Sequence, residues 1–154
     1  MSAKNNGWAL ALMKLVFQNV AVPLIGDAPG ILGSTSAGSL YLAAHTADPL
    51  LDGDQESNEA DFGGYLRVAV LRSSLKWTCD LLDAELGPAR AINLANITFP
   101  TCTSGTATVT HFSVGASSSG PGLILYSGAL AEPRNVSAGI RLIIEPGDLV
   151  LTEF

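Results

Sequence analysis

The sequence predicts a mainly β protein, an antiparallel β-sandwich or small barrel preceded by one N-terminal α-helix. Two observations favour this class: apolar residues recur at helical spacing near the N-terminus, and from Ser39 onward short segments typical of strands alternate with turn residues. About seven such segments suit a sandwich or barrel, and no pattern typical of a parallel βαβ unit occurs. We expect residues 1–22 to form a helical segment, either an attachment arm or a packed helix, and residues 23–154 to form a single β module.

Helical spacing predicts the helix over about Gly7 to Gln18. The residues at this spacing are Trp8, Leu12, Leu15, Val16 and Asn19. Asn5 offers an N-cap, and Pro23 ends any continuation because the residue before a proline disfavours helical geometry. The segment is apolar nearly all round, so we expect it to be buried, on its own domain or against a neighbour. The predicted partner contacts are Trp8, Leu12, Leu15 and Phe17.

The rest of the chain is predicted as strands joined by turns and loops. Residues 25–38 are rich in turn residues and indicate an ordered loop, without the glycine pattern that binds phosphate. Alternating or β-branched segments predict strands within residues 40–45, 65–70, 94–99, 106–114, 123–129, 138–144 and 149–154. Residues 80–91 have some helical character, but Gly87 and Pro88 truncate it, so we expect a loop or a single helical turn there.

Composition excludes several classes of partner. Charged residues make up 14% of the chain and hydrophobic residues 47%, with a net charge of −6. The basic residues are scattered, whereas nucleic-acid binding needs clustered Lys and Arg, so we expect no nucleic-acid partner. The same scattering argues against a membrane surface, and no apolar segment is long enough for a membrane span. Low charge suits a protein with extensive contacts to other protein subunits.

The cysteines and the N-terminus both indicate a protein made in a reducing compartment. Cys79 and Cys102 lie in no metal-binding or redox motif, so we expect two reduced thiols, with a disulfide between them as the alternative. The apolar run 8–17 is interrupted by Lys14 and is not followed by a typical cleavage site. We therefore expect no secretory signal and a soluble, unprocessed protein.

An acidic run between the first two predicted strands is a candidate binding site. It contains six acids and no base: Asp48, Asp52, Asp54, Glu56, Glu59 and Asp61. Calcium prefers oxygen ligands, but a calcium loop counted from Asp52 needs glycine where Ser57 stands and glutamate where Gly63 stands. We interpret the run as a solvated loop and expect no metal ion, with a cation site as the alternative.

The two histidines, His45 and His111, show no catalytic or metal-binding pattern. Each stands in a predicted strand beside a threonine, and no further zinc ligands lie nearby in the sequence. A serine triad needs a poised serine and an acid, yet no GxSxG motif occurs. We expect hydrogen-bonded histidines within a sheet, no cofactor and no enzymatic activity.

Six short segments, in order along the chain, carry a resemblance to a known family. They are GSLYLAAHTADP (38–49), GYLRVAV (64–70), ITFP (97–100), THFSVG (110–115), LYSGAL (125–130) and VSAGI (136–140). The chain resembles a family of small tailed-bacteriophage virion proteins over roughly residues 24–154. Members are often labelled tail-fibre proteins, and others resemble trimeric decoration (cement) proteins of capsid shells. The chain departs from the family pattern at residues 80–91, which are bulkier than a plain connecting loop.

The resemblance implies a structural virion protein. The first hypothesis is a homotrimeric decoration protein that binds the major capsid protein and stabilises the shell. Such a protein lies on the capsid surface of a virion that is assembled in the host bacterial cytoplasm. The apolar N-terminal segment and the low charge favour this hypothesis. The second hypothesis is a tail-fibre or tail-tip component that contacts the host surface, since binding residues usually lie in loops.

Overall fold

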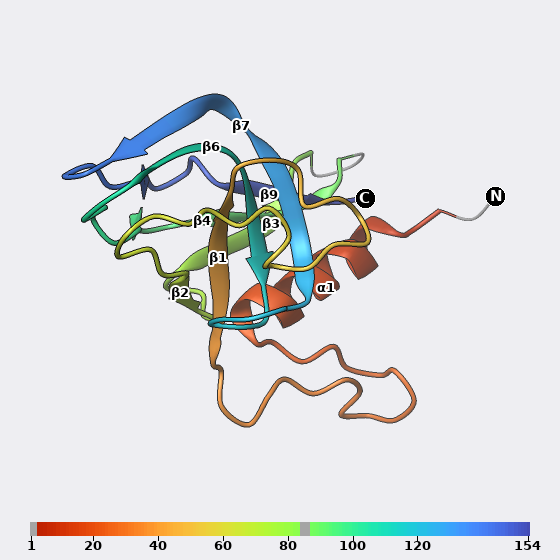
Figure 1. Cartoon of the computed structure of the whole chain (residues 1–154). Helices are drawn as coiled ribbons and strands as arrows, with labels where there is room; N and C mark the ends of the chain where they lie inside the picture. The colour runs from red at the N-terminus through yellow and green to blue at the C-terminus, as the bar shows by residue number, and fades with distance from the viewer. Residues whose placement is uncertain (1–2, 84–86) are drawn as a thin grey trace. The chain divides into compact units, whose positions relative to one another are not determined.

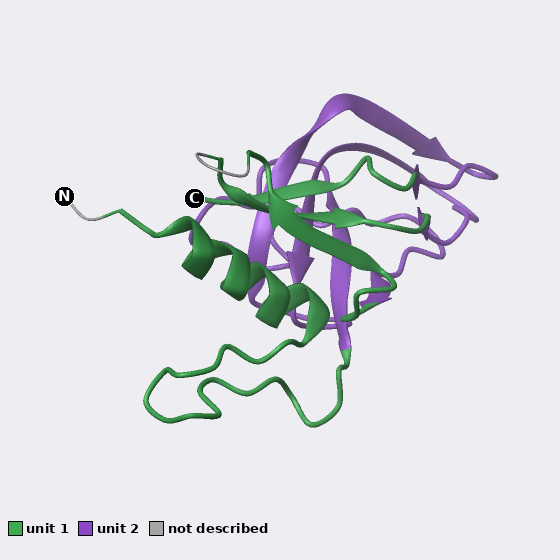
Figure 2. Cartoon of the chain, turned by 180° about the vertical axis from the view of Figure 1, so that it is seen from behind, with its two compact units in different colours: residues 1–38, 71–96, 145–154 green, residues 39–70, 97–144 purple. Residues whose placement is uncertain are grey.

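The computed structural model describes residues 3–83 and 87–154, and the chain forms two compact units (Figure 2). Unit 1 contains residues 1–38, 71–96 and 145–154, and unit 2 contains residues 39–70 and 97–144. The fold is mainly β with antiparallel sheets, and none of the sheets in the described ranges closes into a barrel. The predicted class is therefore confirmed in its sandwich-like form. The predicted boundary between residues 22 and 23 stays a prediction.

Helix α1 (Asn6–Gln18) begins and ends close to its predicted bounds. The Asn5 side chain accepts a hydrogen bond from the N–H of Gly7 (2.8 Å), which caps the first turn. Asn19 takes the left-handed conformation (φ 58°), and its N–H donates to the carbonyl oxygen of Lys14. This left-handed cap ends the helix before Pro23 is reached.

The buried face of α1 lies one position after the predicted face. Its buried residues are Ala9, Met13 and Phe17, and its half-buried residues include Trp8, Leu12 and Leu15. The helix packs on the three-stranded sheet of unit 1 (Figure 2), where the rings of Phe17 and Trp77 meet edge-on with 4.9 Å between their centroids. One face of the helix is thus buried, on its own unit, which is one of the two predicted alternatives.

The sheet of unit 1 consists of β3 (Trp77–Leu81), β4 (Ala89–Asn93) and β9 (Val150–Glu153), in the order β3-β4-β9. The interpretation of residues 80–91 as a loop or helical turn is wrong at both ends, because β3 contains residues 80–81 and β4 contains residues 89–91. Gly87 and Pro88 stop a helix, but they serve equally well to turn the chain between paired strands. The middle of that segment, residues 84–86, lies outside the described residues.

Residues 19–38 form a long loop after α1 (orange in Figure 1), which contains the loop predicted over residues 25–38. Val22 and Ile31 pair across the loop, and the side chain of Asn19 bonds to both main-chain groups of Ser34. Arg72 donates to carbonyl oxygens at the end of α1, and also to the loop. These contacts give the loop a defined shape although it contains no strand or helix of its own.

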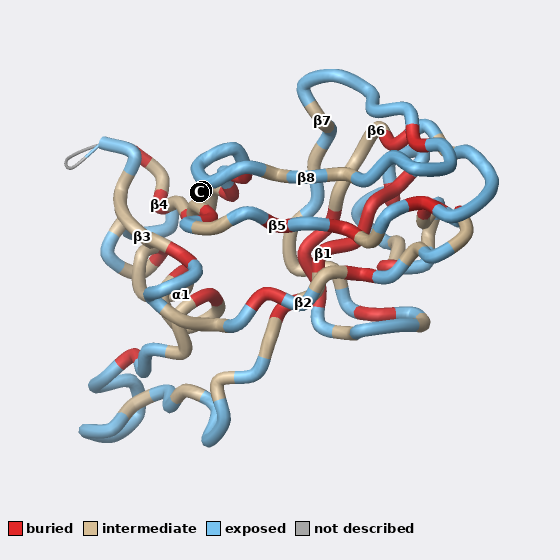
Figure 3. The backbone as a smooth tube through the Cα atoms, turned by 90° about the vertical axis from the view of Figure 1, so that its left-hand side faces the viewer, coloured by how far each residue is buried: buried red, intermediate tan, exposed pale blue. Residues whose placement is uncertain are grey.

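Unit 2 is built on a four-stranded sheet in the order β2-β1-β6-β7. The strands are β1 (Ser39–His45), β2 (Val68–Leu71), β6 (Thr106–Gly115) and β7 (Ile124–Ser137). β1 is buried along most of its length (Figure 3), and β6 pairs antiparallel with both β1 and β7. β7 extends to Ser137 instead of ending near residue 129, because it continues alongside the first half of β6.

Strands β5 (Ile97–Thr98) and β8 (Ile143–Ile144) form a short two-stranded ladder. The strand predicted over residues 138–144 is shorter than expected, because the chain turns at Gly139 (φ 88°) and the N–H of Ile140 donates to Ser137. Among residues 3–83 and 87–154, no helix has the length and hydropathy needed to span a membrane.

Candidate functional site

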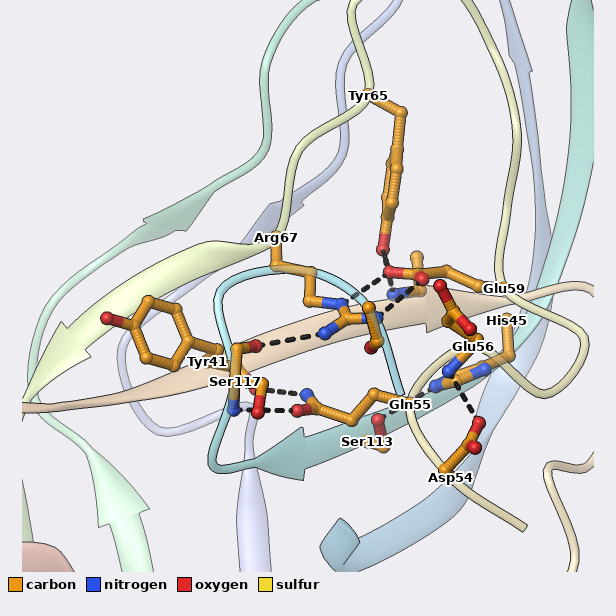
Figure 4. Close-up of polar contacts among 12 residues, drawn as sticks. Tyr41, His45, Asp54, Gln55, Glu56, Glu59, Tyr65, Arg67, Ser113 and Ser117 are labelled. Atoms are coloured by element: carbon orange, nitrogen blue, oxygen red, sulfur yellow. Dashed lines mark hydrogen bonds and ion pairs between the residues drawn. The ribbon is translucent and has the colours of Figure 1, made fainter. Parts of the chain in front are cut away.

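The candidate site is a cluster of buried and half-buried polar side chains in unit 2, which we term the polar network. It connects the segment between β1 and β2, which contains the acidic run, with the loop between β6 and β7 (Figure 4). Its members are His45, Gln55, Glu59, Tyr65, Arg67 and Ser113. Burying a polar group costs free energy unless the group is hydrogen-bonded, so the partners of each side chain show what the network does.

Arg67 and Glu59 form an ion pair at the centre of the network. Arg67 donates from Nε to Glu59 Oε1 (2.7 Å) and from Nη2 to Oε2 (2.8 Å), the two-point geometry that suits a guanidinium and a carboxylate. The side chains are only 2% and 17% exposed, respectively. The Tyr65 hydroxyl donates to Glu59 Oε1 (2.8 Å) and accepts the N–H of Ala44 (3.0 Å). The hydrogen bonds that Arg67 donates to Glu59 raise the pKa of Arg67, and burial raises the pKa of Tyr65.

The remaining N–H groups of Arg67 hold the β6–β7 loop. Nη1 donates to the carbonyl oxygen of Ser117 (3.0 Å), and Nη2 also donates to that of Gly120 (2.7 Å). Through Glu59 on one side and these carbonyls on the other, one guanidinium joins two segments that are about 50 residues apart in sequence. Arg67 therefore helps to hold the β6–β7 loop in place.

Gln55, which is fully buried, makes a second connection between the same two segments. Its Nε2 donates to the carbonyl oxygen of Tyr41 (3.0 Å), and its Oε1 accepts the N–H of Ser117 (3.0 Å). The main-chain N–H of Gln55 donates to Gly122 (2.9 Å). A Cβ atom at Gly115 or Gly122 would collide with the Gln55 amide, so a larger residue at either position would displace the Gln55 side chain. The loop and the side chain below it are therefore fitted to each other.

His45, at the end of β1, is fully buried and hydrogen-bonded at both ring nitrogens, which confirms the prediction of a hydrogen-bonded histidine in a sheet. Nδ1 lies 2.8 Å from the carbonyl oxygen of Ser57, which can only accept, so we assign the hydrogen to Nδ1. Nε2 then accepts from the Ser113 hydroxyl (2.8 Å). Burial lowers the pKa of His45, and the hydrogen bond to Ser57 and the charge of Glu59 oppose this shift only in part. The neutral imidazole therefore ties the acidic run to β6.

The His45–Ser113 pair has the spacing of a serine nucleophile and its base, but its surroundings differ from those of a catalytic triad. Neither side chain is exposed, so a substrate cannot reach the serine hydroxyl in this conformation. The position that a carboxylate occupies in a triad is taken by the carbonyl oxygen of Ser57. This geometry supports a structural role, in which His45 and Ser113 hold the neighbouring main chain in place.

The acidic run is largely an exposed loop, as predicted, but some of its acids also belong to this scaffold. Glu59 pairs with Arg67, while Asp48 and Asp54 accept hydrogen bonds from nearby main-chain N–H groups and so close turns. The exposed acids are Asp48, Asp52, Glu56 and Asp61. Within residues 3–83 and 87–154, no group of three or more His, Cys, Asp or Glu is placed to hold a metal ion.

The residues predicted as partner contacts belong to α1 of unit 1 and are not members of the network. Phe17 is fully buried beside Trp77, whereas Trp8, Leu12 and Leu15 are half-buried. Their contact with a partner stays a prediction.

The second histidine and the two cysteines also lie outside the network. His111 Nδ1 lies 2.9 Å from Thr110 Oγ1, a hydrogen bond of the kind predicted. Cys79 and Cys102 are free thiols, as expected, and burial raises the pKa of Cys79 to about 11. The Cys79 thiol is therefore protonated and poorly nucleophilic at neutral pH.

Sequence reasoning singled out His45 and Glu59 but missed the roles of Arg67, Gln55 and Ser113. Around residue 67, burial runs opposite to what hydropathy predicts. The charged Arg67 is buried, whereas the apolar Leu66 beside it is 66% exposed. One feature of the sequence could have identified Arg67 as a buried residue. It is the only basic residue between positions 15 and 71, and it follows six acids. A lone base after an acidic run is a candidate for a buried ion pair.

The segments that carry the family resemblance also supply much of the network. GSLYLAAHTADP contains His45, GYLRVAV contains Tyr65 and Arg67, and THFSVG contains Ser113. No curated protein matches the chain. A family model described as Gp80, podophage GP4 fiber I protein gp80, matches residues 28–152 and confirms the resemblance to small tailed-phage virion proteins. Because the match covers most of the sequence, the chain belongs to this Gp80 family of podophage fibre proteins.

Proposed function

We propose that the chain is a structural subunit of a fibre on a tailed-phage virion. The observation that carries the proposal is the family match over residues 28–152, whose description names a fibre protein. The family supports a structural phage protein, suggests a location on the virion, and suggests that the chain is not an enzyme. The assignment to a fibre puts the second hypothesis from the sequence ahead of the first.

The polar network supports a role in which loops must keep their shape. Arg67 and Gln55 fix the β6–β7 loop, and His45 and Glu59 fix the acidic run. A loop that is already ordered loses little conformational entropy when it meets a partner. In a fibre subunit, such loops are suited to contact either a neighbouring subunit or the host surface.

Localisation on the virion tests the proposal directly. Gold-labelled antibodies against the chain are expected to bind at the tail of intact virions, and quantitative mass spectrometry is expected to find far fewer copies than of the major capsid protein. A label spread over the head, with a copy number comparable to that of the capsid protein, would refute the fibre assignment and favour a decoration protein.

A capsid decoration protein is the second candidate, and the loop at residues 19–38 favours it. This loop carries one charge, at Asp27, and exposes several large apolar side chains: Val20, Leu24, Ile25, Ile31 and Leu32. An apolar loop of fixed shape suits a protein that lies on a neighbouring subunit such as the major capsid protein. The test is binding to purified heads that lack this protein, where changing Leu24 and Leu32 to serine should abolish binding if the candidate is correct.

We also propose that the chain associates with itself as a homotrimer, as the resemblance to trimeric virion proteins implies. Soluble homo-oligomers usually close with cyclic symmetry, which gives each subunit the same environment. Sedimentation equilibrium of the purified chain should return three times the mass of one chain. A monomer at all concentrations would refute the trimer without bearing on the location of the protein in the virion.

A further inference from the structure

The tight turn at residues 48–53, which we term the leucine turn, holds two leucines in solvent. Leu50 is 61% exposed and Leu51 is fully exposed. The Asp48 carboxylate accepts the N–H of Leu50 (2.9 Å), and the Leu50 carbonyl accepts the N–H of Gly53 (3.4 Å). Pro49, which lies between Asp48 and Leu50, is fully buried and anchors the turn. The hydrogen bonds of the turn and the buried Pro49 therefore hold the two leucines in an exposed position.

The backbone conformation of the leucine turn indicates that the fold fixes the exposed position of the two leucines. Leu50 has φ 66°, a left-handed conformation that side-chain-bearing residues rarely adopt. Gly53 cannot be replaced without a shift, because a Cβ there would collide with the carbonyl oxygen of Pro49. Strained backbone of this kind persists where the surroundings fix it, and it is concentrated at functional positions. An exposed apolar patch with a polar rim is typical of a protein–protein interaction site.

Charge narrows the kind of surface that can accept the leucine turn. Asp52 and Glu56 are exposed beside the leucines, and the nearest base in sequence, Arg67, is buried and already paired with Glu59. The turn thus offers an apolar anchor with an acidic rim. A complementary surface is apolar and carries a positive charge that is free to pair.

The same chain carries such a surface at residues 140–143, which we term the Ile–Arg surface. Ile140 and Ile143 are each 47% exposed, and Arg141 between them is exposed. Its main chain is fixed, since the N–H of Cys102 donates to Ile140 and the N–H of Gly139 donates to Cys102, both at 2.8 Å. Within the described residues, the Arg141 side chain makes no hydrogen bond or ion pair, so its charge is available.

We propose that the leucine turn of one copy docks on the Ile–Arg surface of a second copy. Leu50 and Leu51 pack against Ile140 and Ile143, and the acidic rim pairs with Arg141. Two different surfaces meet, so the contact is heterologous and generates a closed ring when its rotation closes. This contact rests on the self-association proposed above and supplies its residues.

Complementation between two damaged surfaces tests the contact. One variant carries Leu51→Ser with Asp52→Lys, and the other carries Arg141→Glu with Ile143→Thr. A matched control carries Leu75→Ser with Lys76→Glu, which makes the same kinds of change at exposed positions of unit 1. Circular dichroism and thermal melting verify that each variant is folded, and sedimentation velocity measures its association.

Each damaged variant alone should associate at least about tenfold more weakly than the wild type, while the control associates normally. A mixture of the two should form a one-to-one complex, because each supplies the surface that the other lacks. If a folded variant associates as strongly as the wild type, or if the mixture stays monomeric, the contact is wrong. A monomeric wild type overturns it too, while labelling of the virion tests the fibre assignment separately.

Discussion

The two units differ in what orders their interiors. In unit 1, α1 covers a three-stranded sheet through apolar side chains, with Phe17 and Trp77 in edge-on contact. In unit 2, the segment between β1 and β2 holds the ion pair of Arg67 and Glu59, and His45 is buried at the end of β1. Hydrophobic burial is non-directional, whereas hydrogen bonds fix positions, and the hydrogen bonds of titratable side chains also depend on pH. The comparison indicates that the packing of α1 on its sheet in unit 1 depends on volume, whereas the loops around the sheet of unit 2 depend on hydrogen-bond and ion-pair partners.

The largest effect is expected from removing volume in unit 1. Trp77→Ala should lower the free energy of unfolding by about 4 kcal/mol, because it deletes a fully buried ring and leaves a cavity beside Phe17. The Trp77 indole N–H has no hydrogen-bond partner in the described chain, so the loss comes from packing alone. Urea denaturation followed by far-ultraviolet circular dichroism measures it. A loss below about 1 kcal/mol would show that volume does not dominate this unit.

Breaking the ion pair in unit 2 should have the next largest effect. Glu59→Ala leaves the Arg67 guanidinium buried without its carboxylate, and we expect a loss of about 3 kcal/mol. The double variant Glu59→Ala with Arg67→Met removes both charges and should be more stable than Glu59→Ala alone. Urea denaturation of the wild type, Glu59→Ala, Arg67→Met and the double variant completes the cycle. Additive losses would contradict the view that partners, and not volume, determine stability here.

The contrast between the units also explains how far sequence could predict them. Helix α1 and most strands follow from spacing and turn residues, which are local properties. β3 and β4 were missed because Gly87 and Pro88 end a helix and a strand equally well. The network was missed because its contacts join residues far apart in sequence, such as Arg67 with Ser117. Charge alone could not distinguish buried Glu59 from exposed Asp52 in the same acidic run.

Acid should weaken unit 2 through His45. Its pKa is lowered by burial from 6.5, so the unfolded chain binds a proton more readily than the folded one. The stability that His45 contributes is therefore fully present above about pH 6.5 and is lost as pH falls through the folded pKa, at no more than about 1.4 kcal/mol per pH unit. Urea denaturation at several pH values measures this slope.

A His45→Gln variant isolates the contribution of the histidine from that of the carboxylates. Glutamine can still donate a hydrogen bond, but it does not titrate in this range. The slope of stability against pH should therefore be shallower in the variant than in the wild type below pH 6.5. Identical slopes would show that His45 does not titrate with folding.

Smaller effects should separate the acids within the run. Asp54 accepts the N–H groups of Glu56 and Ser57, so Asp54→Ala should cost about 1 kcal/mol, as at other turn caps. Asp52→Ala is the matched control, because its side chain is exposed, and it should change stability by less than about 0.5 kcal/mol. Equal effects in urea denaturation would contradict the division of the run into structural and exposed acids.

Calcium should have the smallest effect of all. Asp48, Asp54 and Glu59 already direct carboxylate oxygens at N–H donors of the chain, so a cation would have to displace those bonds. Calcium also prefers several oxygen ligands converging on one point, and the described residues place no three acidic or other metal-binding side chains in that way. Added calcium at fixed ionic strength should therefore leave the melting temperature unchanged. A marked rise in the melting temperature would mean that the exposed acids converge on a calcium ion. The acidic run would then bind a ligand in addition to its structural role.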